Sequence, residues 1–416
     1  MDFKDTPQEA EFRAEARAWL DANAKLKDPN SSEGFGMFSE RENPDMIKRA
    51  QAWQAKKADA GWACITWPKE YGGRGGTVME NIIFNQEERR YETPPNVFGI
   101  GIGMAGPTIM THGTEEQKKR HLPPMARGDI IWCQLFSEPG AGSDLAALRT
   151  RSERQGDEWV VNGQKVWTSG AHYSKWGILV TRSDFDAPKH KGLTYFVVDM
   201  ESPGIEVRPI KQMTGGANFN EVFFSDVRIP DTNRLDAVGN GWSVAITTLM
   251  NERMSIGTGM NLAPADAFDE LRRLAESAYL DGAPAIENSL VRNRIAEFYT
   301  RLKSLELTGY RTLSYISRGA MPGTESAVLK LAGGILLQEM SAFAMELQGP
   351  LGIEHGADAS FNHGLFQDIY LGIPAMRIAG GSDEVQRNVI GERELGLPQE
   401  NRVDKGVPFK DVPTGA

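Results

Sequence analysis

Apolar and polar residues along the chain follow three patterns in succession. Residues 1–128 place apolar side chains at helical spacing, whereas residues 129–236 carry short β-branched and aromatic runs between glycine, proline and Asn-Gly turns. Helical spacing returns in residues 237–416. We therefore predict three domains with these boundaries in an α+β fold that is mainly α, the middle domain being a small antiparallel barrel or sandwich.

Local signals place several of the helices. The first helix should begin at Pro7, because Thr6 is a good cap and proline suits the first helical position. A second helix is predicted over about 45–60, before Gly61. In the last domain the spacing predicts helices over residues 241–277, 288–318, 323–348 and 383–393. The tail from Leu397 is rich in charge and proline and should be extended.

Composition narrows the class of protein. Of the 416 residues, 40% are hydrophobic and 25% charged, which is ordinary for a globular protein of more than one domain. The only cysteines, Cys64 and Cys133, provide neither a disulfide framework nor a CxxC metal site, and the six histidines show no metal-binding spacing. The first residues do not resemble a signal peptide, and no apolar run approaches the roughly 20 residues of a membrane span. We expect a reducing, cytoplasmic compartment.

The formal net charge of −10, without a basic patch, argues against a nucleic-acid-binding protein. An acidic chain can still bind a polyanion such as coenzyme A through local donors, so the charge excludes little else.

The most specific motif is a glycine-rich turn at residues 134–144, QLFSEPGAGSD. It combines a short apolar strand with a proline-set turn and glycines that let the backbone approach a ligand closely. Its serine hydroxyls and exposed N–H groups could stabilise the negative charge of a reduced flavin. It is neither a GxGxxG fingerprint after a strand nor a P-loop. An ordinary surface turn is the alternative.

This turn and residues 163–169, GQKVWTS, closely resemble signatures of the acyl-CoA dehydrogenase family. Further landmarks in the family's order stand at residues 113–118, 224–230, 346–352 and 381–387. The resemblance covers nearly the whole chain. It implies an N-terminal helical domain, a middle antiparallel β-barrel and a C-terminal four-helix bundle. It also implies FAD as cofactor and dehydrogenation of an acyl-CoA thioester to the trans-2-enoyl-CoA.

The resemblance implies which residues hold FAD. Trp167 could instead belong to the barrel core, and Ser382 could simply cap a helix, because Ser-Asp-Glu is good capping chemistry. The residues that match the family's cofactor contacts are Gln134, Leu135, Phe136, Ser137, Gly142, Ser143, Trp167, Thr168, Ser169, Glu346, Gly349, Ser382 and Glu384.

The catalytic base is not where many family members carry it. In those members a glutamate stands in a late loop, at the position that Gly380 occupies here. Isovaleryl-CoA and long-chain dehydrogenases instead place it just before an arginine on the first helix of the last domain, and Glu252 and Arg253 match this pair. Arg253 falls within the helix's apolar stripe and Glu252 at its edge, where charges should be paired or functional.

By this reading Glu252 abstracts the α-proton while hydride passes from Cβ to flavin N5. A structural pairing of Glu252 with Arg253 is the alternative, although adjacent helix residues do not face each other well.

Substrate contacts are implied for Ser143, Arg253, Gly380 and Gly381. The backbone N–H of Gly380 would polarise the thioester carbonyl, a role that does not depend on its side chain. The small residues Ala379 and Gly380 suggest room for a branched, long or polycyclic acyl group. Small residues of the first domain could lengthen the same pocket: Gly99, Gly101, Gly103 and Ala105.

One family feature is missing. The Arg-x-x-Phe-Gly motif that reaches a neighbouring subunit's FAD is absent between about 270 and 292, where Arg292 or Arg294 could substitute. The resemblance otherwise implies a homotetramer (a dimer of dimers) and electron-transfer flavoprotein as acceptor. Two alternatives remain open: an oxygen-using flavoenzyme of the same fold, and a partner subunit of a heteromeric, for example sterol side-chain, dehydrogenase.

Overall fold

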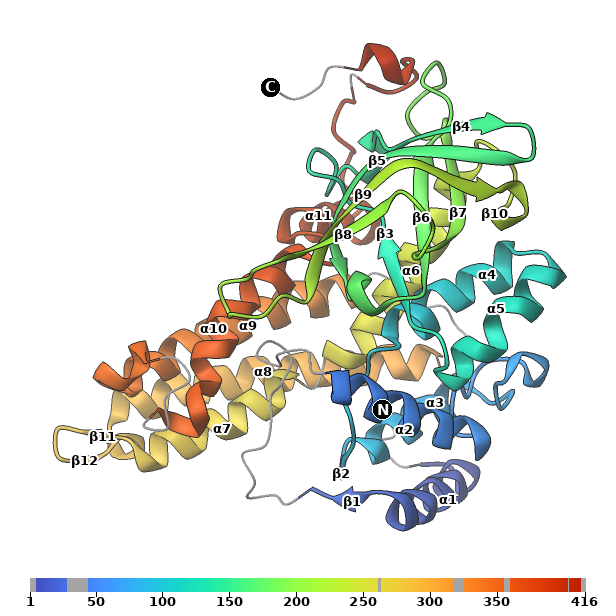
Figure 1. Ribbon diagram of the computed structural model, residues 1–416. Helices are drawn as coiled ribbons and strands as arrows, with labels where there is room; N and C mark the ends of the chain where they lie inside the picture. Colours follow the sequence, from blue (N-terminus) through green and yellow to red (C-terminus); the bar gives the residue numbers. More distant parts are fainter. Residues whose placement is uncertain are drawn as a thin grey trace.

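Figure 1 shows the computed structural model, in which a β-sheet lies beside the helices of the first region and a long helical bundle extends away from both. The structure describes residues 5–27, 44–260, 263–316, 325–354, 360–402 and 404–412.

The first region is helical, as predicted. Thr6 caps the first helix with a reciprocal capping box that includes Glu9, and the helix begins at Pro7. A π-helical turn, Gly101–Ala105, runs directly into the fourth helix. The helices are α1 (Pro7–Asn23), α2 (Pro44–Asp59), α3 (Val78–Glu88), α4 (Gly106–His112) and α5 (Glu115–Arg127), and the short strands β1 (Lys25–Leu26) and β2 (Tyr91–Glu92) pair with each other.

The middle region forms one eight-stranded sheet among the described residues. Its strands are β3 (Trp132–Leu135), β4 (Arg151–Gln155), β5 (Glu158–Ser169), β6 (Trp176–Arg182), β7 (Leu193–Asp199), β8 (Ile205–Ile210), β9 (Phe219–Pro230) and β10 (Arg234–Leu235). The order is β10-β7-β6-β4-β5-β9-β8, with β3 added beside β6.

Two details differ from the expected antiparallel barrel. Among the described residues, β10 and β8 stand at opposite ends of the strand order, so the sheet does not close into a barrel. The sheet is also mixed, because β6 pairs in parallel with both β3 and β4. Hydrophobic periodicity reports which strand positions are buried but not which strands are neighbours, and it therefore could not show these pairings.

The last region is helical, with α6 (Gly241–Met260), α7 (Ala263–Ser277), α8 (Ser289–Ile316), α9 (Glu325–Leu347), α10 (Leu365–Ile378) and α11 (Asp383–Val389), and with a hairpin of β11 (Tyr279–Leu280) and β12 (Ala283–Pro284). Helices α7, α8, α9 and α10 share one hydrophobic core. The single predicted helix over 241–277 is two helices, and α10 was not predicted. Helix α6 joins a different core, built with the first two regions.

Helix α9 is the one described helix that is long and apolar enough to cross a membrane by length and composition. The sequence reading missed this property. Half of its most apolar stretch is buried inside the protein, where residues such as Leu336 and Met340 contribute to the bundle core. This is the pattern of a core helix and is weak evidence for a membrane span.

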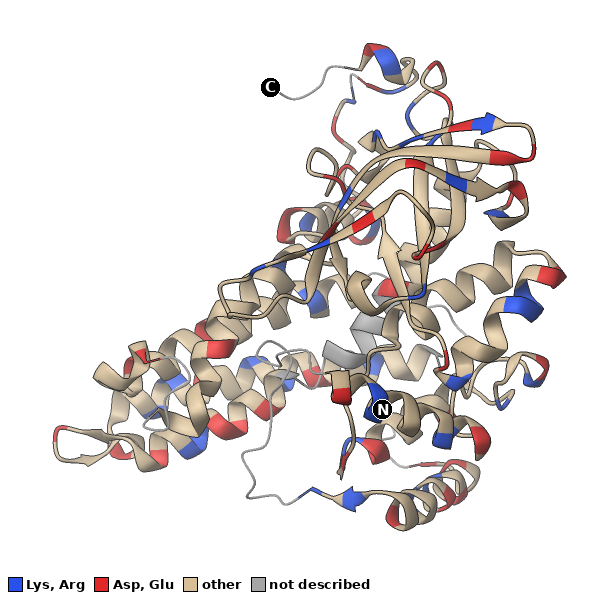
Figure 2. Cartoon of the chain, viewed as in Figure 1, with Lys and Arg blue, Asp and Glu red and all other residues tan. Residues whose placement is uncertain are grey.

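Charged residues of both signs are distributed over all three regions in Figure 2. Several of them form i,i+3 or i,i+4 pairs along a helix, such as Arg272 with Glu276.

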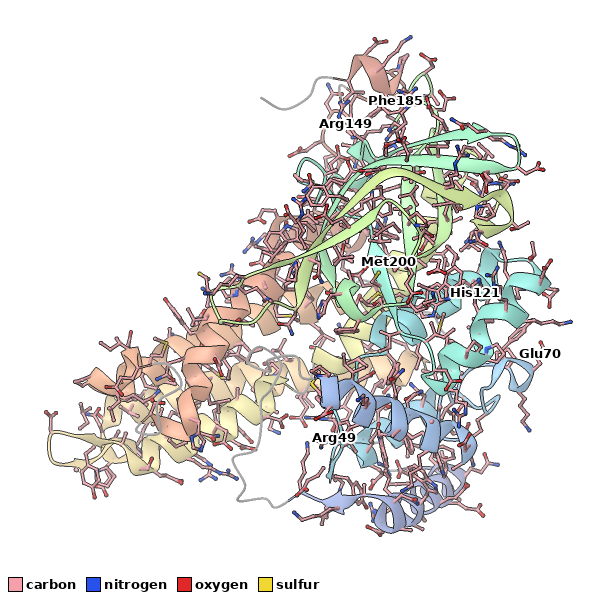
Figure 3. All side chains as sticks on the ribbon, viewed as in Figure 1. Arg49, Glu70, His121, Arg149, Phe185 and Met200 are labelled. Atoms are coloured by element: carbon pink, nitrogen blue, oxygen red, sulfur yellow. The ribbon has the colours of Figure 1, made fainter. Side chains whose placement is uncertain are left out.

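The C-terminal tail does not simply extend away. Its described part returns to the sheet and contains a 3-10 turn, Phe409–Asp411. Phe409 is buried, and its ring lies 3.4 Å from the guanidinium carbon of Arg182. Figure 3 shows Arg149 and Phe185 close together at the end of the sheet where this turn docks, and both contact Phe409. Packing of Phe409 against the sheet explains the difference from the expected extended tail. The polar composition of the tail gave no indication of this contact.

A buried carboxylate locks α1 against α3. Glu87, on α3, accepts hydrogen bonds from Arg13 and Arg17 of α1 and from Arg90, at 2.8–3.1 Å. Burial raises the pKa of Glu87, but the bonds from these three arginines outweigh it and lower the pKa to about 2. Because the folded-state pKa is depressed, the stabilisation is present above the ordinary value of 4.5 and is lost as the pH falls through about 2.

We predict that Glu87→Gln lowers the free energy of unfolding by about 2 kcal/mol at pH 7, after allowance for solvent screening of the partly exposed arginines. Urea unfolding at a series of pH values should show the difference between wild type and variant shrinking below pH 4.5. Glu158→Gln, which breaks an exposed pair with Arg228, should cost less than about 1 kcal/mol. An equal cost for both variants would contradict this account.

Candidate active site

A carboxylate of α6 meets an amide of β3 where the last region contacts the sheet. Glu252 is buried, and the Nε2 atom of Gln134 donates a hydrogen bond to its Oε2 atom at 3.3 Å. The residues are 118 positions apart, so only the tertiary fold brings them together. The base predicted from one motif therefore contacts the first residue of the predicted flavin turn.

Three hydroxyl groups fix α6 one turn before Glu252. The Oγ1 atom of Thr248 lies 2.9 Å from both Tyr195 Oη on β7 and Thr108 Oγ1 on α4. All three side chains are fully buried. Every donor is satisfied if Tyr195 donates to Thr248, Thr248 to Thr108, and Thr108 to the carbonyl of Met104 at 2.8 Å. Each of the three regions thus contributes one hydroxyl to this cluster.

A second link joins α4 to α6. His112, the last residue of α4, lies 2.8 Å from the carboxylate of Asp236 and 2.9 Å from the hydroxyl of Thr247. With the hydroxyl cluster, it fixes both the rotation and the height of α6 against the first region.

A buried ion pair holds the glycine-rich turn. Lys165, fully buried on β5, donates to the carbonyl of Phe136 and to the carboxylate of Glu138, both at 2.9 Å. The same carboxylate accepts the backbone N–H groups of Arg149 and Thr150 at 2.6 and 2.8 Å. Burial raises the pKa of Glu138, but the charge of Lys165 and these hydrogen bonds leave it below its ordinary value. The turn is therefore held both by the Lys165 side chain and by the backbone of Arg149 and Thr150.

Trp167 stands out on β5. The pairing of β5 with β9 shifts register between Lys165 and Thr168, and within this bulge Trp167 adopts a left-handed backbone with φ +60°. Its ring is 59% exposed, although it belongs to a strand whose neighbouring residues are buried. Left-handed backbone is costly for an aromatic residue and is enriched at functional sites. The alternative that Trp167 belongs to the sheet core is therefore wrong.

Beside Trp167 lie two buried polar atoms without a hydrogen-bond partner among the described residues: Thr168 Oγ1 and Asn220 Oδ1. The two residues are opposite each other on β5 and β9, and the Asn220 amide donates to the Thr168 carbonyl at 2.9 Å. A Cβ atom added at Gly142 would meet nothing within 4 Å. The exposed aromatic ring, the partly exposed hydroxyl of Ser169 and the open glycine turn fit a flat, polar-edged ring such as a flavin.

The loop after α10 contains two consecutive glycines with left-handed backbone, Gly380 at φ +65° and Gly381 at φ +96°. Ser382 then caps α11, and its hydroxyl accepts the Val385 N–H at 3.4 Å. The capping role of Ser382 is therefore real, and Glu384 is exposed in the first turn of α11.

Other predicted cofactor residues have different exposures. Leu135 and Phe136 are buried in the hydrophobic cores, so only their backbone could contact a ligand. Ser137 and Ser169 are partly exposed. Gly142 and Ser143 are exposed in the glycine-rich turn, so their placement leaves a ligand access to the turn.

Some predicted residues are not brought to this site within one chain. Glu346 lies at the end of α9, and Gly349 begins the 3-10 turn that follows it. Lys330, which contacts the Gly381 loop, lies 16 residues earlier on α9, or roughly 24 Å of helix. The backbone of Arg253 continues α6, but its side chain lies outside the described residues.

The candidate substitutes for the missing arginine motif differ. Arg294 is engaged inside the chain with Glu297 and Glu339, at 2.6 and 3.2 Å. Arg292 is exposed. Of the two, Arg292 is the better placed to reach a neighbouring molecule.

Two of the four small residues of the first region serve packing. A Cβ at Gly101 would lie 3.3 Å from both Met125 and Trp132, and Ala105 is buried in the core. Gly101 and Ala105 therefore serve packing, and the expectation that small residues here lengthen the substrate pocket stays a prediction for Gly99 and Gly103. Gly103 is partly buried, and a Cβ at Gly99 would meet nothing within 4 Å.

Comparison with known proteins decides the family. Residues 6–129, 133–227 and 239–395 match the models of the acyl-CoA dehydrogenase N-terminal, middle and C-terminal domains. The chain belongs to the acyl-CoA dehydrogenase family. Acyl-CoA dehydrogenases are oxidoreductases and FAD-binding flavoproteins, and their three regions agree with the helical, β and helical regions seen here.

Curated relatives include acyl-CoA dehydrogenase IpdE1 of Mycobacterium tuberculosis, which is 37% identical over 94% of this chain and 98% of its own length. Acyl-CoA dehydrogenase FadE34 of the same organism is 40% identical over 83% of this chain, which spans 46% of that protein. Among solved structures, the ChsE4-ChsE5 complex of M. tuberculosis has a TM-score of 0.78 with 30% identity, covering 96% of this chain and 100% of that one. The Tcur3481-Tcur3483 steroid ACAD has a TM-score of 0.79 with 26% identity and the same coverage.

Sequence reasoning missed several residues that shape this acyl-CoA dehydrogenase site. Lys165 is a charged residue at a buried strand position, and that mismatch could have identified it as the partner of a buried acid. Asn220 and Thr248 carry no signal beyond a polar residue among apolar ones. Their partners come from other regions of the fold, so only the structure shows them.

We predict that Thr248→Val destabilises the enzyme by about 1–3 kcal/mol, because it leaves the Tyr195 hydroxyl buried without its acceptor. Urea unfolding should show that the double variant with Tyr195→Phe loses less than the sum of the two single variants. The control is Thr300, an exposed residue of α8 whose hydroxyl bonds the carbonyl of Ala296. Thr300→Val should change the free energy of unfolding by less than about 0.5 kcal/mol. Additive losses at Thr248 and Tyr195 would contradict their coupling.

Proposed function

We propose that the chain dehydrogenates an acyl-CoA thioester between Cα and Cβ to the trans-2-enoyl-CoA, with Glu252 as the base. The observation that carries this proposal is the contact of buried Glu252 with Gln134, which places a carboxylate beside the glycine-rich turn. The alternative pairing of Glu252 with Arg253 alone does not account for that contact.

In this reaction Glu252 takes the proton from Cα, and the hydrogen on Cβ leaves with its electron pair. When bound, FAD supplies the two-electron acceptor for that hydrogen, at flavin N5. Gln134 holds Oε2 of Glu252, which limits the orientations of the carboxylate and reduces the entropy lost in reaching the α-proton. A buried base is also less hydrated and therefore readier to accept a proton.

The chain's own residues suit the cofactor. Trp167 presents an exposed ring, and Ser169, which is partly exposed, follows at the end of β5. We propose that these residues and the glycine-rich turn, including Gly142 and Ser143, hold the flavin ring. Glu346 and Gly349, at the far end of α9, would then contact FAD only across a subunit interface.

We further propose that the Gly380 N–H binds the thioester carbonyl, and that Ser143, Arg253 and Gly381 contact the substrate. Negative charge builds up on the carbonyl oxygen as the α-proton leaves, so a fixed donor there accelerates the step.

The small residues Ala379 and Gly380 favour a branched, long or polycyclic acyl group, and the likeness to a steroid ACAD supports the polycyclic class. Electron-transfer flavoprotein is the proposed acceptor and the cytoplasm the proposed location.

We predict that purified enzyme with bound FAD loses its flavin absorbance when mixed anaerobically with one class of thioester. The panel should contain butyryl-, isovaleryl-, octanoyl- and palmitoyl-CoA and a CoA thioester with a steroid ring system. Glu252→Gln should slow the bleaching by about 10²–10⁴-fold, because an amide cannot accept the proton.

Glu276→Gln, which alters an exposed glutamate of α7 paired with Arg272, is the matched control and should bleach at the wild-type rate. Bleaching that survives Glu252→Gln would exclude Glu252 as the base. A bound flavin that no thioester bleaches, but that air reoxidises rapidly after chemical reduction, would favour an oxygen-using flavoenzyme.

A second candidate function is that of a subunit in a heteromeric acyl-CoA dehydrogenase. Two similar structures bear paired names, ChsE4-ChsE5 and Tcur3481-Tcur3483, and this chain lacks the Arg-x-x-Phe-Gly motif. Engagement of Arg294 within its own chain favours this reading as well.

Native mass spectrometry with flavin quantification separates the two functions. A self-sufficient enzyme should form four copies of the 45.9 kDa chain with one FAD each. FAD well below one per chain, together with bleaching only after a second polypeptide is added, would instead identify this chain as a partner subunit.

A further inference from the structure

The loop between α10 and α11 is held by its carbonyl groups. Lys330, buried on α9, donates from Nζ to the carbonyl of Gly381 at 2.5 Å and to that of Arg377 at 3.1 Å. Gln386, buried on α11, donates from Nε2 to the carbonyls of Gly380 and Gly381 at 2.9 and 3.2 Å. Two buried side chains from different helices thus bond the carbonyls of Gly380 and Gly381 in the loop and that of Arg377 at the end of α10.

The amide groups of the same loop are in the opposite situation. Neither Gly380 N–H nor Gly381 N–H donates a hydrogen bond to another described residue, whereas the preceding Ala379 N–H closes α10 by bonding Ala375. A Cβ at Gly381 would lie 2.5 Å from Nε2 of Gln386, so the glycine permits this close approach. The carbonyls of Gly380 and Gly381 therefore bond the protein, whereas the two N–H groups are available to a ligand.

A buried charge cluster keeps Lys330 in place. The carboxylate of Asp383 lies 3.9 Å from Lys330 Nζ, and it accepts a bond from Arg377 Nε at 2.7 Å. Arg377 is fixed in turn by Gln338 of α9 at 2.5 Å. Because leaving any of these charges unpaired would be costly, the cluster favours a single arrangement of the loop.

We infer that Lys330 and Gln386 are positioning residues that hold the Gly380–Gly381 loop in the conformation in which its amides can bind the thioester carbonyl oxygen. This inference rests on the proposed dehydrogenation and deepens it, because it names the groups that orient the donors. Neither side chain touches the substrate itself. A lysine that bonds the last carbonyls of a helix can also be a simple C-cap, so the test must separate positioning from capping.

The test compares two variants. Lys330→Met keeps the length but removes the donors, and Lys303→Met replaces a partly exposed lysine of α8 that pairs with Glu306. We expect Lys330→Met to lower kcat about 10²-fold while KM changes less than about 3-fold, as for a displaced transition-state donor. Lys303→Met should leave both unchanged. Gln386→Met should act in the same direction, and it decides the question if Lys330→Met fails to fold.

A second readout is made after the flavin has been reduced chemically, so that the thioester binds without being turned over. The infrared stretching frequency of a ¹³C-labelled carbonyl, in the panel thioester that bleaches the flavin, reports how strongly the bound carbonyl is polarised. It should be lowered in the wild type and move back toward its value in water in Lys330→Met and Gln386→Met.

Folded variants that keep the wild-type frequency would overturn the inference, even if kcat falls, because such a fall would reflect structure alone. The proposed function would then still stand on the wild-type bleaching. A wild type that binds no thioester of the panel would overturn the proposed function and the inference together.

Discussion

Three hydroxyl groups meet where the three regions of the chain come together, and the geometry of the site depends on them. Thr108, Tyr195 and Thr248 come from α4, β7 and α6 and are fully buried. A buried hydroxyl without a partner is costly, so the bond between Tyr195 and Thr248 favours one register of α6 against the sheet. Apolar packing alone would tolerate small rotations of a helix, whereas directional bonds do not.

That register places Glu252 one helical turn further on, at Gln134. It also brings α6 of the last region next to the glycine-rich turn of the middle region, because Gln134 leads into that turn. The turn is fixed separately by the buried pair of Lys165 and Glu138. Each loop of the candidate site is thus held by buried polar groups behind it, which leaves the loop free to face a ligand without losing its shape.

Much of the fold could be predicted from local signals. The capped start of α1, the helices of the first region and the change to strands after residue 128 follow from capping, periodicity and β-branched runs. The strand neighbours could not be predicted, because burial patterns do not specify pairing, and the open, mixed sheet is therefore different from the expected barrel. The docked tail was missed because a single aromatic residue, Phe409, overrides the polar composition around it.

The sequence by itself determined the family, the candidate base Glu252 and the glycine-rich turn, because short motifs keep their residue types at fixed spacing. Only the tertiary structure decided that Gln134 contacts Glu252, that Trp167 is exposed on a strained bulge, and that Lys330 and Gln386 hold the Gly380 loop. The contacts join residues between 6 and 118 positions apart, and the exposed bulge is a backbone conformation set by strand register. Spacing along a chain carries no information on either, since both are fixed only when the regions pack and their buried polar groups find partners.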